Sequence, residues 1–152
     1  MSAEDGPPFR LRPATLLDVP QLAALEASAM TGAWTEREIA EEAQSSLARL
    51  VLAEDLSGAV LGYALGWEVA GETQILRVAV GASHRRQGLG RALLEALCLA
   101  CGGGEALLEV RVSNLPAITL YERAGFEITG RREAYYRDGE AAILMSRPAP
   151  TA

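Results

Sequence analysis

The stretch Arg85-Arg86-Gln87-Gly88-Leu89-Gly90-Arg91 decides the fold of this chain, because it joins a predicted strand to a predicted helix. Residues 73–80 before it have the composition of a strand, and residues 89–100 after it carry apolar side chains at helical spacing. Consecutive backbone N–H groups at a helix N-terminus bind anions, and Gly88 and Gly90 have no Cβ to keep a phosphate away from the backbone. Arginines on both sides add positive charge. The stretch therefore predicts a phosphate site at a strand-to-helix turn.

Two better-known phosphate motifs are excluded by the sequence. The pattern G-x-x-x-x-G-K-[ST] of a P-loop is absent, and a dinucleotide-binding fingerprint needs a third glycine early in a strand–helix–strand unit. Because a glycine pair alone also closes ordinary turns, the prediction depends on the preceding strand, the following helix and the flanking arginines.

The elements around this stretch are predicted in the order β-α-α-β-β-β-α-β-α-β-β, which is typical of an α/β domain with one mixed sheet flanked by helices. Thr35 and Glu38 form a T-x-x-E capping box, and Trp34 and Ile39 occupy the positions of a hydrophobic staple. The predicted strands are residues 9–14, 48–54, 59–68, 73–80, 106–112, 126–132 and 140–147, and the predicted helices are residues 15–30, 35–44, 89–100 and 114–125.

The composition predicts one domain with its own core, because the chain has 152 residues of which 49% are hydrophobic. We expect this domain over residues 8–147, with flexible tails at residues 1–7 and 148–152. Two cysteines and one histidine exclude a disulfide framework and a structural zinc site, so we expect no metal. The sequence shows no signal peptide and no apolar run that could span a bilayer, which predicts a cytoplasmic protein without a membrane partner.

The net charge of −6 argues against non-specific nucleic-acid binding and is compatible with a basic partner. Four glutamates add an acidic face to the second predicted helix, although such faces are usually only solvated: Glu36, Glu38, Glu41 and Glu42.

Short motifs along most of the chain resemble the GNAT acetyltransferase superfamily. The pattern R-x-x-G-x-G over residues 85–90, directly after a strand, resembles the acetyl-CoA pyrophosphate loop of that superfamily. Among the members of this superfamily, RimI-type ribosomal-protein N-alpha-acetyltransferases carry motifs similar to the LEVR, SN and LYE of this chain at the same spacing. The resemblance spans about residues 9–147 and is carried by residues 33–36, 75–80, 108–111, 113–114, 117, 120–122, 125–126, 132 and 135–136.

The resemblance implies a single GNAT domain in which the strands bearing Val80 and Glu109 splay apart, with the pantetheine arm of acetyl-CoA between them. The backbone amide of Val80 would polarise the thioester carbonyl. Asn114 would bind the amide arm of the cofactor and is also an expected helix N-cap. The cofactor-binding residues implied in this way are Val78, Ala79, Val80, Arg85, Arg86, Gln87, Gly88, Leu89, Gly90, Arg91 and Asn114.

The reaction implied by the resemblance is acetyl transfer from a thioester to an amine. An amine attacks only when it is neutral, so a base must take its proton, and the leaving thiolate then needs a proton. Glu109 matches the general base of the family, and Tyr121 matches its general acid. On the residues alone, Glu109 could lie on the solvated face of a strand, and Tyr121 could be a packed helix residue with its hydroxyl at the surface.

The resemblance also places Trp34, Arg77, Tyr135 and Tyr136 at the site of the acceptor. Arg77 stands where RimI-type enzymes usually carry asparagine, which adds a positive charge close to the incoming amine. That charge could oppose a basic peptide or be neutralised by a nearby carboxylate. Trp34 could instead serve only as a staple, and the two tyrosines could be exposed only because they precede a turn.

Three further residues with reactive side chains are predicted to have no chemical role. Cys98 and Cys101 have C-x-x-C spacing, but both lie near a helix end without a second pair, so we expect packed thiols. His84 is expected to be a solvated loop residue.

We therefore expect an enzyme that transfers acetyl from acetyl-CoA to the α-amino group of a basic protein N-terminus, with a small-subunit ribosomal protein as the acceptor. The amine would attack the thioester directly. Two alternatives stay open, a GNAT enzyme for a small amine or an antibiotic, and a module that binds acetyl-CoA without chemistry. Glu109 and Tyr121 disfavour the second alternative, and the paired tyrosines with the acidic helix face favour a basic peptide over a small amine.

Overall fold

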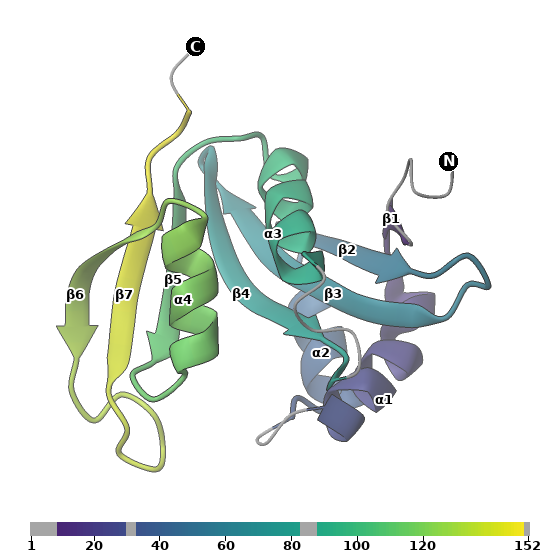
Figure 1. The fold of residues 1–152 in the computed structure, drawn as a ribbon, viewed down its shortest axis with the longest axis horizontal. Helices are drawn as coiled ribbons and strands as arrows, with labels where there is room; N and C mark the ends of the chain where they lie inside the picture. Colours follow the sequence, from purple (N-terminus) through teal and green to yellow (C-terminus); the bar gives the residue numbers. More distant parts are fainter. Residues whose placement is uncertain (1–8, 30–32, 83–87, 151–152) are drawn as a thin grey trace.

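One mixed sheet runs through the whole molecule in a computed structural model that describes residues 9–29, 33–82 and 88–150 (Figure 1). The strand order is β1-β2-β3-β4-β5-β7-β6, and all neighbours are antiparallel except β4 and β5. The strands are β1 (Arg10–Pro13), β2 (Ala48–Glu54), β3 (Val60–Val69), β4 (Glu72–Val80), β5 (Ala106–Arg111), β6 (Glu127–Arg132) and β7 (Ala142–Arg147).

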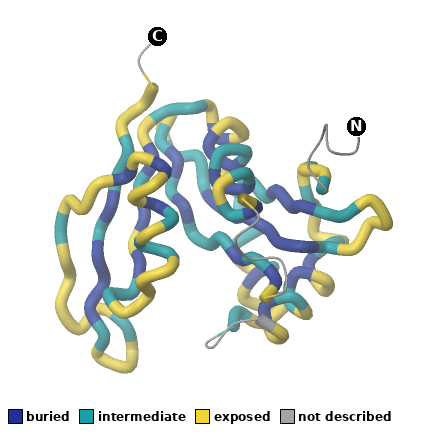
Figure 2. The backbone as a smooth tube through the Cα atoms, in the orientation of Figure 1, coloured by how far each residue is buried: buried dark blue, intermediate teal, exposed yellow. Residues whose placement is uncertain are grey.

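Helices cover both faces of this sheet. They are α1 (Val19–Ala29), α2 (Glu36–Ala43), α3 (Leu89–Ala100) and α4 (Leu115–Arg123). One core cluster joins the sheet to α3 and α4, and a second joins β2, β3 and β4 to α1 and α2 on the opposite face. Burial is accordingly deepest along the central strands (Figure 2). Within the described residues, no helix is both long and apolar enough to cross a bilayer.

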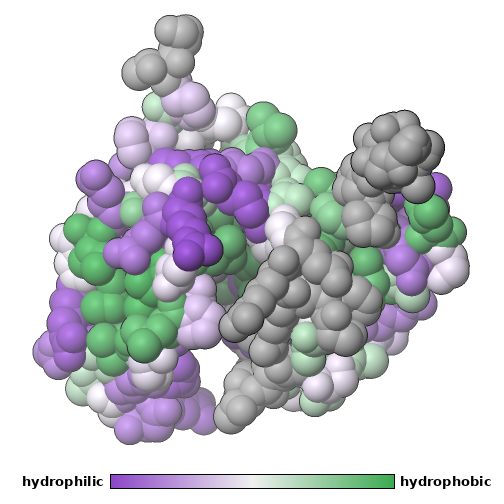
Figure 3. All heavy atoms as spheres, in the orientation of Figure 1, coloured by the Kyte–Doolittle hydropathy of each residue, from purple (hydrophilic) through white to green (hydrophobic). Residues whose placement is uncertain are grey.

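The predicted splay between β4 and β5 is confirmed by their short pairing. The two strands are in register only from Thr73, opposite Ala106, to Ile75, opposite Leu108. Beyond Ile75, β4 continues to Val80 along β3 and curves away from β5 (Figure 1). The space-filling view shows apolar side chains gathered on the side of the molecule that carries α4 (Figure 3).

A bulge in β4 sets which side chains line the cleft between the splayed ends of β4 and β5. Leu65 of β3 lies opposite Arg77, but the next residue, Gly66, lies opposite Ile75, so Leu76 has no partner across the ladder. An extra residue of this kind shifts the alternation of side chains between the two faces. As a result Val78 and Val80 pack against the α3–α4 cluster, whereas Leu76 packs on the α1–α2 side.

The helix starts follow the local signals in the sequence. Thr35 accepts a hydrogen bond from the backbone of Glu38, and Glu38 caps Thr35 in return, which confirms the predicted capping box. Thr15 also forms a capping box, but its first turn, Leu16–Asp18, is a 3₁₀ helix that precedes α1 rather than part of α1 itself. The predicted element order is confirmed. The predicted tail at residues 1–7 lies outside the described residues.

Candidate active site

Helix α3 begins where the phosphate site is predicted. Gly88 is the N-cap residue, has a left-handed φ of +80°, and makes no side-chain cap. A Cβ built on Gly88 would meet no atom within 4 Å, so the surface there is open. The first N–H groups of a helix need outside partners, and the helix dipole favours an anionic one. This end of α3 therefore fits a pyrophosphate group. Arg85, Arg86 and Gln87 lie outside the described residues.

Gly90 has a different structural reason to be glycine than the one predicted. A Cβ on Gly90 would lie 3.3 Å from Leu120 of α4 and 3.8 Å from Val80 of β4. The missing side chain thus lets α3 approach α4 and β4 closely, in addition to any approach of a phosphate. The guanidinium of Arg91 donates to Glu95, one turn further along α3, at 2.8 Å and to the carbonyl of Arg123 in α4 at 3.1 Å.

Asn114 and the end of β4 flank the same side of the cleft. The Asn114 side chain accepts from the backbone N–H of Ala117 at 3.3 Å, which confirms it as the N-cap of α4, and the residue stays exposed. Leu89 is buried in the α3–α4 cluster, and Ala79 is buried in the α1–α2 cluster. Because β5 does not pair with β4 beyond Ile75, the edge of β4 up to Val80 faces the cleft.

Glu109 lies at the edge of the cleft, one residue beyond the last β4–β5 pair. Its side chain is 36% exposed, on the face of β5 opposite α4. Its Oε1 accepts a hydrogen bond of 2.8 Å from the hydroxyl of Tyr135, and its Oε2 lies 3.8 Å from the guanidinium of Arg132. The carboxylate is therefore oriented by two groups of the β6–β7 segment and still accessible to a substrate.

Tyr121 lies on α4 in the core cluster next to α3 and is only 6% exposed. Its ring contacts Phe126 edge to face, and its hydroxyl makes no hydrogen bond among the described residues. Burial raises the pKa of Tyr121 to about 12, although the charge of Arg77 acts in the opposite direction. The hydroxyl thus carries its proton throughout the physiological pH range and can donate it.

Glu26 is a buried carboxylate that the sequence analysis did not assign to the site, and it binds both Arg77 and the backbone of Trp34. Glu26 of α1 is 0% exposed and accepts four hydrogen bonds. They come from Arg77 Nε at 2.9 Å, Arg77 Nη2 at 2.6 Å, the hydroxyl of Tyr63 at 2.5 Å and the backbone N–H of Trp34 at 3.1 Å. The guanidinium of Arg77 also lies 5.2 Å from the centre of the Trp34 ring. Of the two predicted fates of the Arg77 charge, neutralisation by a carboxylate is the one observed.

The ionisation of this cluster follows from its contacts. Burial alone would raise the pKa of Glu26, but the hydrogen bonds from Arg77 and Tyr63 and the positive charge of Arg77 outweigh it, so the pKa is lowered. Burial and the charge of Glu26 together raise the pKa of Tyr63. Glu26 is therefore an anion paired with Arg77 at neutral pH. The only sequence signal for it is a glutamate at an apolar position of the helical pattern.

We expect Glu26→Gln to lower the free energy of unfolding by about 3 kcal/mol at neutral pH, because it leaves Arg77 without its buried counter-charge. Since the pKa of Glu26 is lowered in the folded state, this contribution is fully present above the ordinary carboxyl pKa of about 4.5 and is lost as the pH falls through the lowered value. Urea unfolding of wild type and variant measures the loss of stability at pH 7, and the same comparison at pH 3 measures how much of that loss remains in acid. Glu68→Gln, which breaks the more exposed pair of Arg49 and Glu68, should cost less than about 1 kcal/mol. Equal losses in the two variants at pH 7 would contradict the expectation.

Two of the three aromatic residues predicted at the acceptor site, Tyr135 and Tyr136, lie in the segment between β6 and β7. Tyr135 is exposed and bonds Glu109, and its ring lies edge to face with that of Tyr136. Arg111 of β5 lies 4.1 Å from the centre of the Tyr136 ring and also forms ion pairs with Asp138 and Glu140 at 2.8 and 2.9 Å. These contacts hold the segment against the end of β5 and place a tyrosine beside the candidate base.

A groove of about 340 Å³ continues from Glu109 along the face of β5 opposite α4. Sequence reasoning missed most of its lining, because the residues come from four different strands and carry no common motif. Besides Glu109 and Arg132, the lining is Gln74, Ile75, Leu76, Leu107, Leu108, Thr129, Leu144 and Met145. It gives room for an extended chain that leads away from the candidate base.

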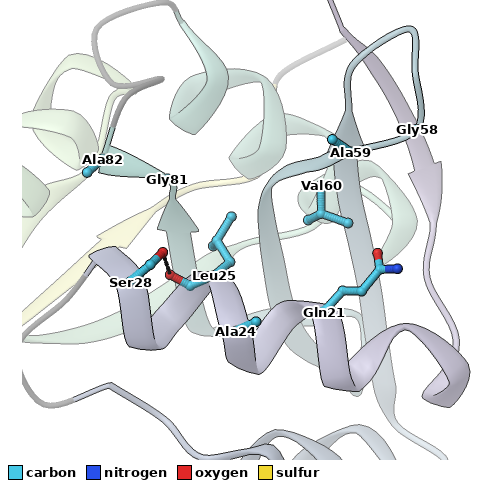
Figure 4. A pocket seen from close by; sticks show the side chains of 9 residues that line it. All are labelled: Gln21, Ala24, Leu25, Ser28, Gly58, Ala59, Val60, Gly81 and Ala82. Atoms are coloured by element: carbon cyan, nitrogen blue, oxygen red, sulfur yellow. Dashed lines mark hydrogen bonds between the residues drawn. The ribbon is translucent and has the colours of Figure 1, made fainter.

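A larger hollow of about 620 Å³ lies between α1 and the ends of β3 and β4, lined by Gln21, Ala24, Leu25, Ser28, Gly58, Ala59, Val60, Gly81 and Ala82 (Figure 4). Its polar side chains are those of Gln21 and Ser28, and the Ser28 hydroxyl already donates to the carbonyl of Leu25 at 3.0 Å. Its lining includes neither an acid nor a base, so we place the chemistry in the cleft instead.

The remaining predictions concern residues away from the cleft. Cys98 and Cys101 are free and buried, and burial raises the pKa of both thiols, which confirms them as packed side chains. His84 lies outside the described residues. In the described part of the chain, no three His, Cys, Asp or Glu side chains gather as metal ligands would.

Known proteins of similar sequence and fold indicate the family to which this chain belongs. A family model described as the acetyltransferase (GNAT) family matches residues 19–126. The chain is 37% identical over 137 residues to the ribosomal protein bS18-alanine N-acetyltransferase of Escherichia coli strain K12, which covers 86% of this chain and 91% of that one. It is 34% identical over 162 residues to an N-alpha-acetyltransferase of Sulfurisphaera tokodaii, covering 96% of each. The crystal structure of the ribosomal-protein-S18-alanine N-acetyltransferase from Escherichia coli matches with a TM-score of 0.84 at 33% identity, over 95% of this chain and 96% of that one.

Proposed function

The chain belongs to the GNAT acetyltransferase family, and from this membership we propose that it acetylates the α-amino group of a protein N-terminus, with a ribosomal protein as acceptor. Enzymes of this family use acetyl-CoA. The observation that carries the proposal is Glu109, a carboxylate at the mouth of the cleft with a groove beyond it. A ribosomal acceptor places the reaction in the cytoplasm.

The cofactor would bind along the α3–α4 side of the cleft. The N-terminal N–H groups of α3 from Gly88 onward would hold its pyrophosphate, and the open edge of β4 at Val78 and Val80 would bond the amide arm. Asn114 makes one hydrogen bond through its side-chain oxygen, which leaves its amide N–H groups for the same arm. Bound acetyl-CoA supplies a thioester whose acetyl carbon accepts the amine.

Proton transfers would be carried by two side chains of this protein. Glu109, directly or through one water, takes a proton from the attacking α-amine as the new carbon–nitrogen bond forms. As the carbon–sulfur bond breaks, the electron pair stays on sulfur, and Tyr121 donates its phenolic proton there. An α-amine has a pKa near 8, against about 10.4 for a lysine side chain, so a carboxylate base suits the N-terminus better.

The walls of the cleft favour a peptide over a small amine. The acceptor would lie between Trp34 with Arg77 on one wall and Glu109 with Tyr135 on the other, with the groove beside Glu109 open to the rest of the peptide. Aromatic side chains at an open groove provide broad contact with an extended backbone. The net charge of −6 adds attraction for a basic segment.

We expect a peptide with a small first residue followed by arginine to be acetylated at its α-amine, with kcat/KM falling as salt rises because the attraction is screened. Mass spectrometry of the peptide after incubation with protein and acetyl-CoA locates the acetyl group. Replacing that arginine by glutamate in the peptide should lower kcat/KM further. Aminoglycosides and polyamines serve as comparison acceptors, and a higher kcat/KM for one of them than for every peptide would replace the proposal with a small-amine enzyme.

A further inference from the structure

The hydroxyl of Tyr135 contacts the carboxylate that the proposed reaction needs. It donates to Oε1 of Glu109 at 2.8 Å, and this hydrogen bond raises the pKa of Tyr135, so the hydroxyl keeps its proton. The guanidinium of Arg132 lies 3.8 Å from Oε2 of the same carboxylate, which is too far for a hydrogen bond. Because each carboxylate oxygen has two lone pairs, Tyr135 fixes Oε1 and leaves Oε2 for an amine or a bridging water.

The backbone around Tyr135 is fixed by contacts to Glu140. The N–H groups of Tyr135 and Tyr136 both donate to the carbonyl of Glu140 at 3.1 Å. The side chain of Glu140 accepts in turn from Arg111 of β5 at 2.9 Å and from the backbone N–H of Ser113 at 2.8 Å. The segment that carries Tyr135 is therefore tied both to β5 and to the turn that leads into α4.

The residue before Tyr135 adopts a strained conformation. Ala134 has a φ of +49°, in the left-handed region that residues with a Cβ rarely adopt. Such strain persists only where the surrounding contacts determine the conformation. The ring of Tyr135 adds two such contacts, since its centre lies 5.6 Å from the guanidinium of Arg132 and 5.1 Å from the centre of the Tyr136 ring. The direction of Tyr135 toward Glu109 is therefore built into the chain itself.

Glu109 gains from this contact because its side chain is partly exposed. A glutamate side chain has several rotatable bonds, and few of its rotamers would direct the carboxylate at an incoming amine. Fast reaction requires the reacting atoms to lie within about 3–3.5 Å of one another. A hydrogen bond that selects one rotamer of the base therefore raises the rate of the chemical step without adding affinity for the substrate.

We propose that Tyr135 is a positioning residue for the candidate base, because its hydroxyl holds the carboxylate of Glu109 in the rotamer that takes the proton of the α-amine. This inference rests on the proposed N-terminal acetylation and gives Tyr135 a role in the chemical step, in place of the peptide contact expected from the sequence. The two roles have different kinetic effects. A lost peptide contact raises KM, whereas a misplaced base lowers the rate of the chemical step at saturating peptide.

The test uses single turnovers of the small-residue peptide above, with protein in excess over acetyl-CoA, so that product release does not mask the chemical step. Tyr135→Phe keeps the ring and removes the hydroxyl. We expect its rate constant at saturating peptide to fall about tenfold, while the half-saturating peptide concentration changes less than about twofold. Glu133→Gln breaks an exposed ion pair with Arg131 in the same segment and should keep the rate constant of wild type.

Tyr135→Phe in the background of Glu109→Gln shows whether the hydroxyl acts through the carboxylate. Without the carboxylate there is no base to position, so the second substitution should change the rate constant less than about twofold. Equal losses in the two backgrounds overturn the inference, and so does a Tyr135→Phe variant with the rate constant of wild type, whether or not its half-saturating peptide concentration rises. These outcomes leave the proposed function intact, whereas wild-type protein that acetylates no peptide at its α-amine contradicts the proposed function itself.

Discussion

Glu109→Gln should lower kcat for peptide acetylation at least about a hundredfold, because the amide keeps the shape of the side chain and cannot take a proton. The affinity for acetyl-CoA should change little, since Glu109 lies on the sheet face opposite α3 and α4. Part of the activity should return at high pH, where more of the acceptor amine is already neutral. Steady-state kinetics from pH 6 to pH 10, with calorimetry for acetyl-CoA, separate the two effects.

Glu127→Gln is the matched control for this variant. Glu127 is an exposed glutamate on β6 of the same half of the sheet, outside the cleft and the groove. Its kinetics should equal those of wild type at every pH. Full activity of Glu109→Gln on an accepted peptide would remove Glu109 as the base and strengthen the alternative of a protein that binds acetyl-CoA without chemistry.

Gly88→Glu should weaken acetyl-CoA binding at least about a hundredfold. The new carboxylate would stand at the N-terminus of α3, where the pyrophosphate is proposed to accept backbone hydrogen bonds, and would repel it. A side chain at Gly88 meets no atom of the protein within 4 Å, so the substitution adds backbone strain at φ +80° without a steric clash. Calorimetric titration with acetyl-CoA measures the effect.

Gly103→Glu provides a control with the same strain at the other end of α3. Gly103 has a φ of +75°, and a Cβ there also meets nothing within 4 Å. Its stability should fall as much as that of Gly88→Glu, while its affinity for acetyl-CoA stays that of wild type. Equal affinities in the two variants would show that the pyrophosphate binds elsewhere.

The sequence predicts those parts of the molecule that depend on neighbours along the chain. The capping box joins Thr35 to Glu38, and the N-cap joins Asn114 to Ala117. In each case the partners are three positions apart in the chain, and both contacts are present. The strand-to-helix turn at Gly88 follows from the same kind of signal. These features need no knowledge of the tertiary fold, because the partner groups are close in the chain whatever the rest of it does.

The parts that sequence reasoning missed depend on contacts between distant residues. Glu26 meets Arg77 across 51 positions of the chain and Tyr63 across 37, and no local pattern announces either contact. The bulge at Leu76, which turns Arg77 toward α1, is a property of the pairing with β3 rather than of the β4 sequence. Only the three-dimensional structure could therefore decide whether the charge of Arg77 opposes a basic peptide or is neutralised by a carboxylate. The proposed roles of the predicted catalytic and binding residues stay predictions that the variants above test.

The position of β7 has a consequence for the protein during its synthesis. β7, at Ala142–Arg147, lies between β5 and β6, and Leu144 is the residue opposite Glu109. The strands β1 to β4 pair in chain order and can assemble as they leave the ribosome, whereas β5 gains its neighbour on that side only when residues 142–147 emerge. A nascent chain can therefore hold a formed N-terminal half while the strand that bears the proposed base still has an open edge. A nascent chain whose residues 127–132 have emerged but whose residues 142–147 have not would expose the edges of both β5 and β6 to wrong pairing.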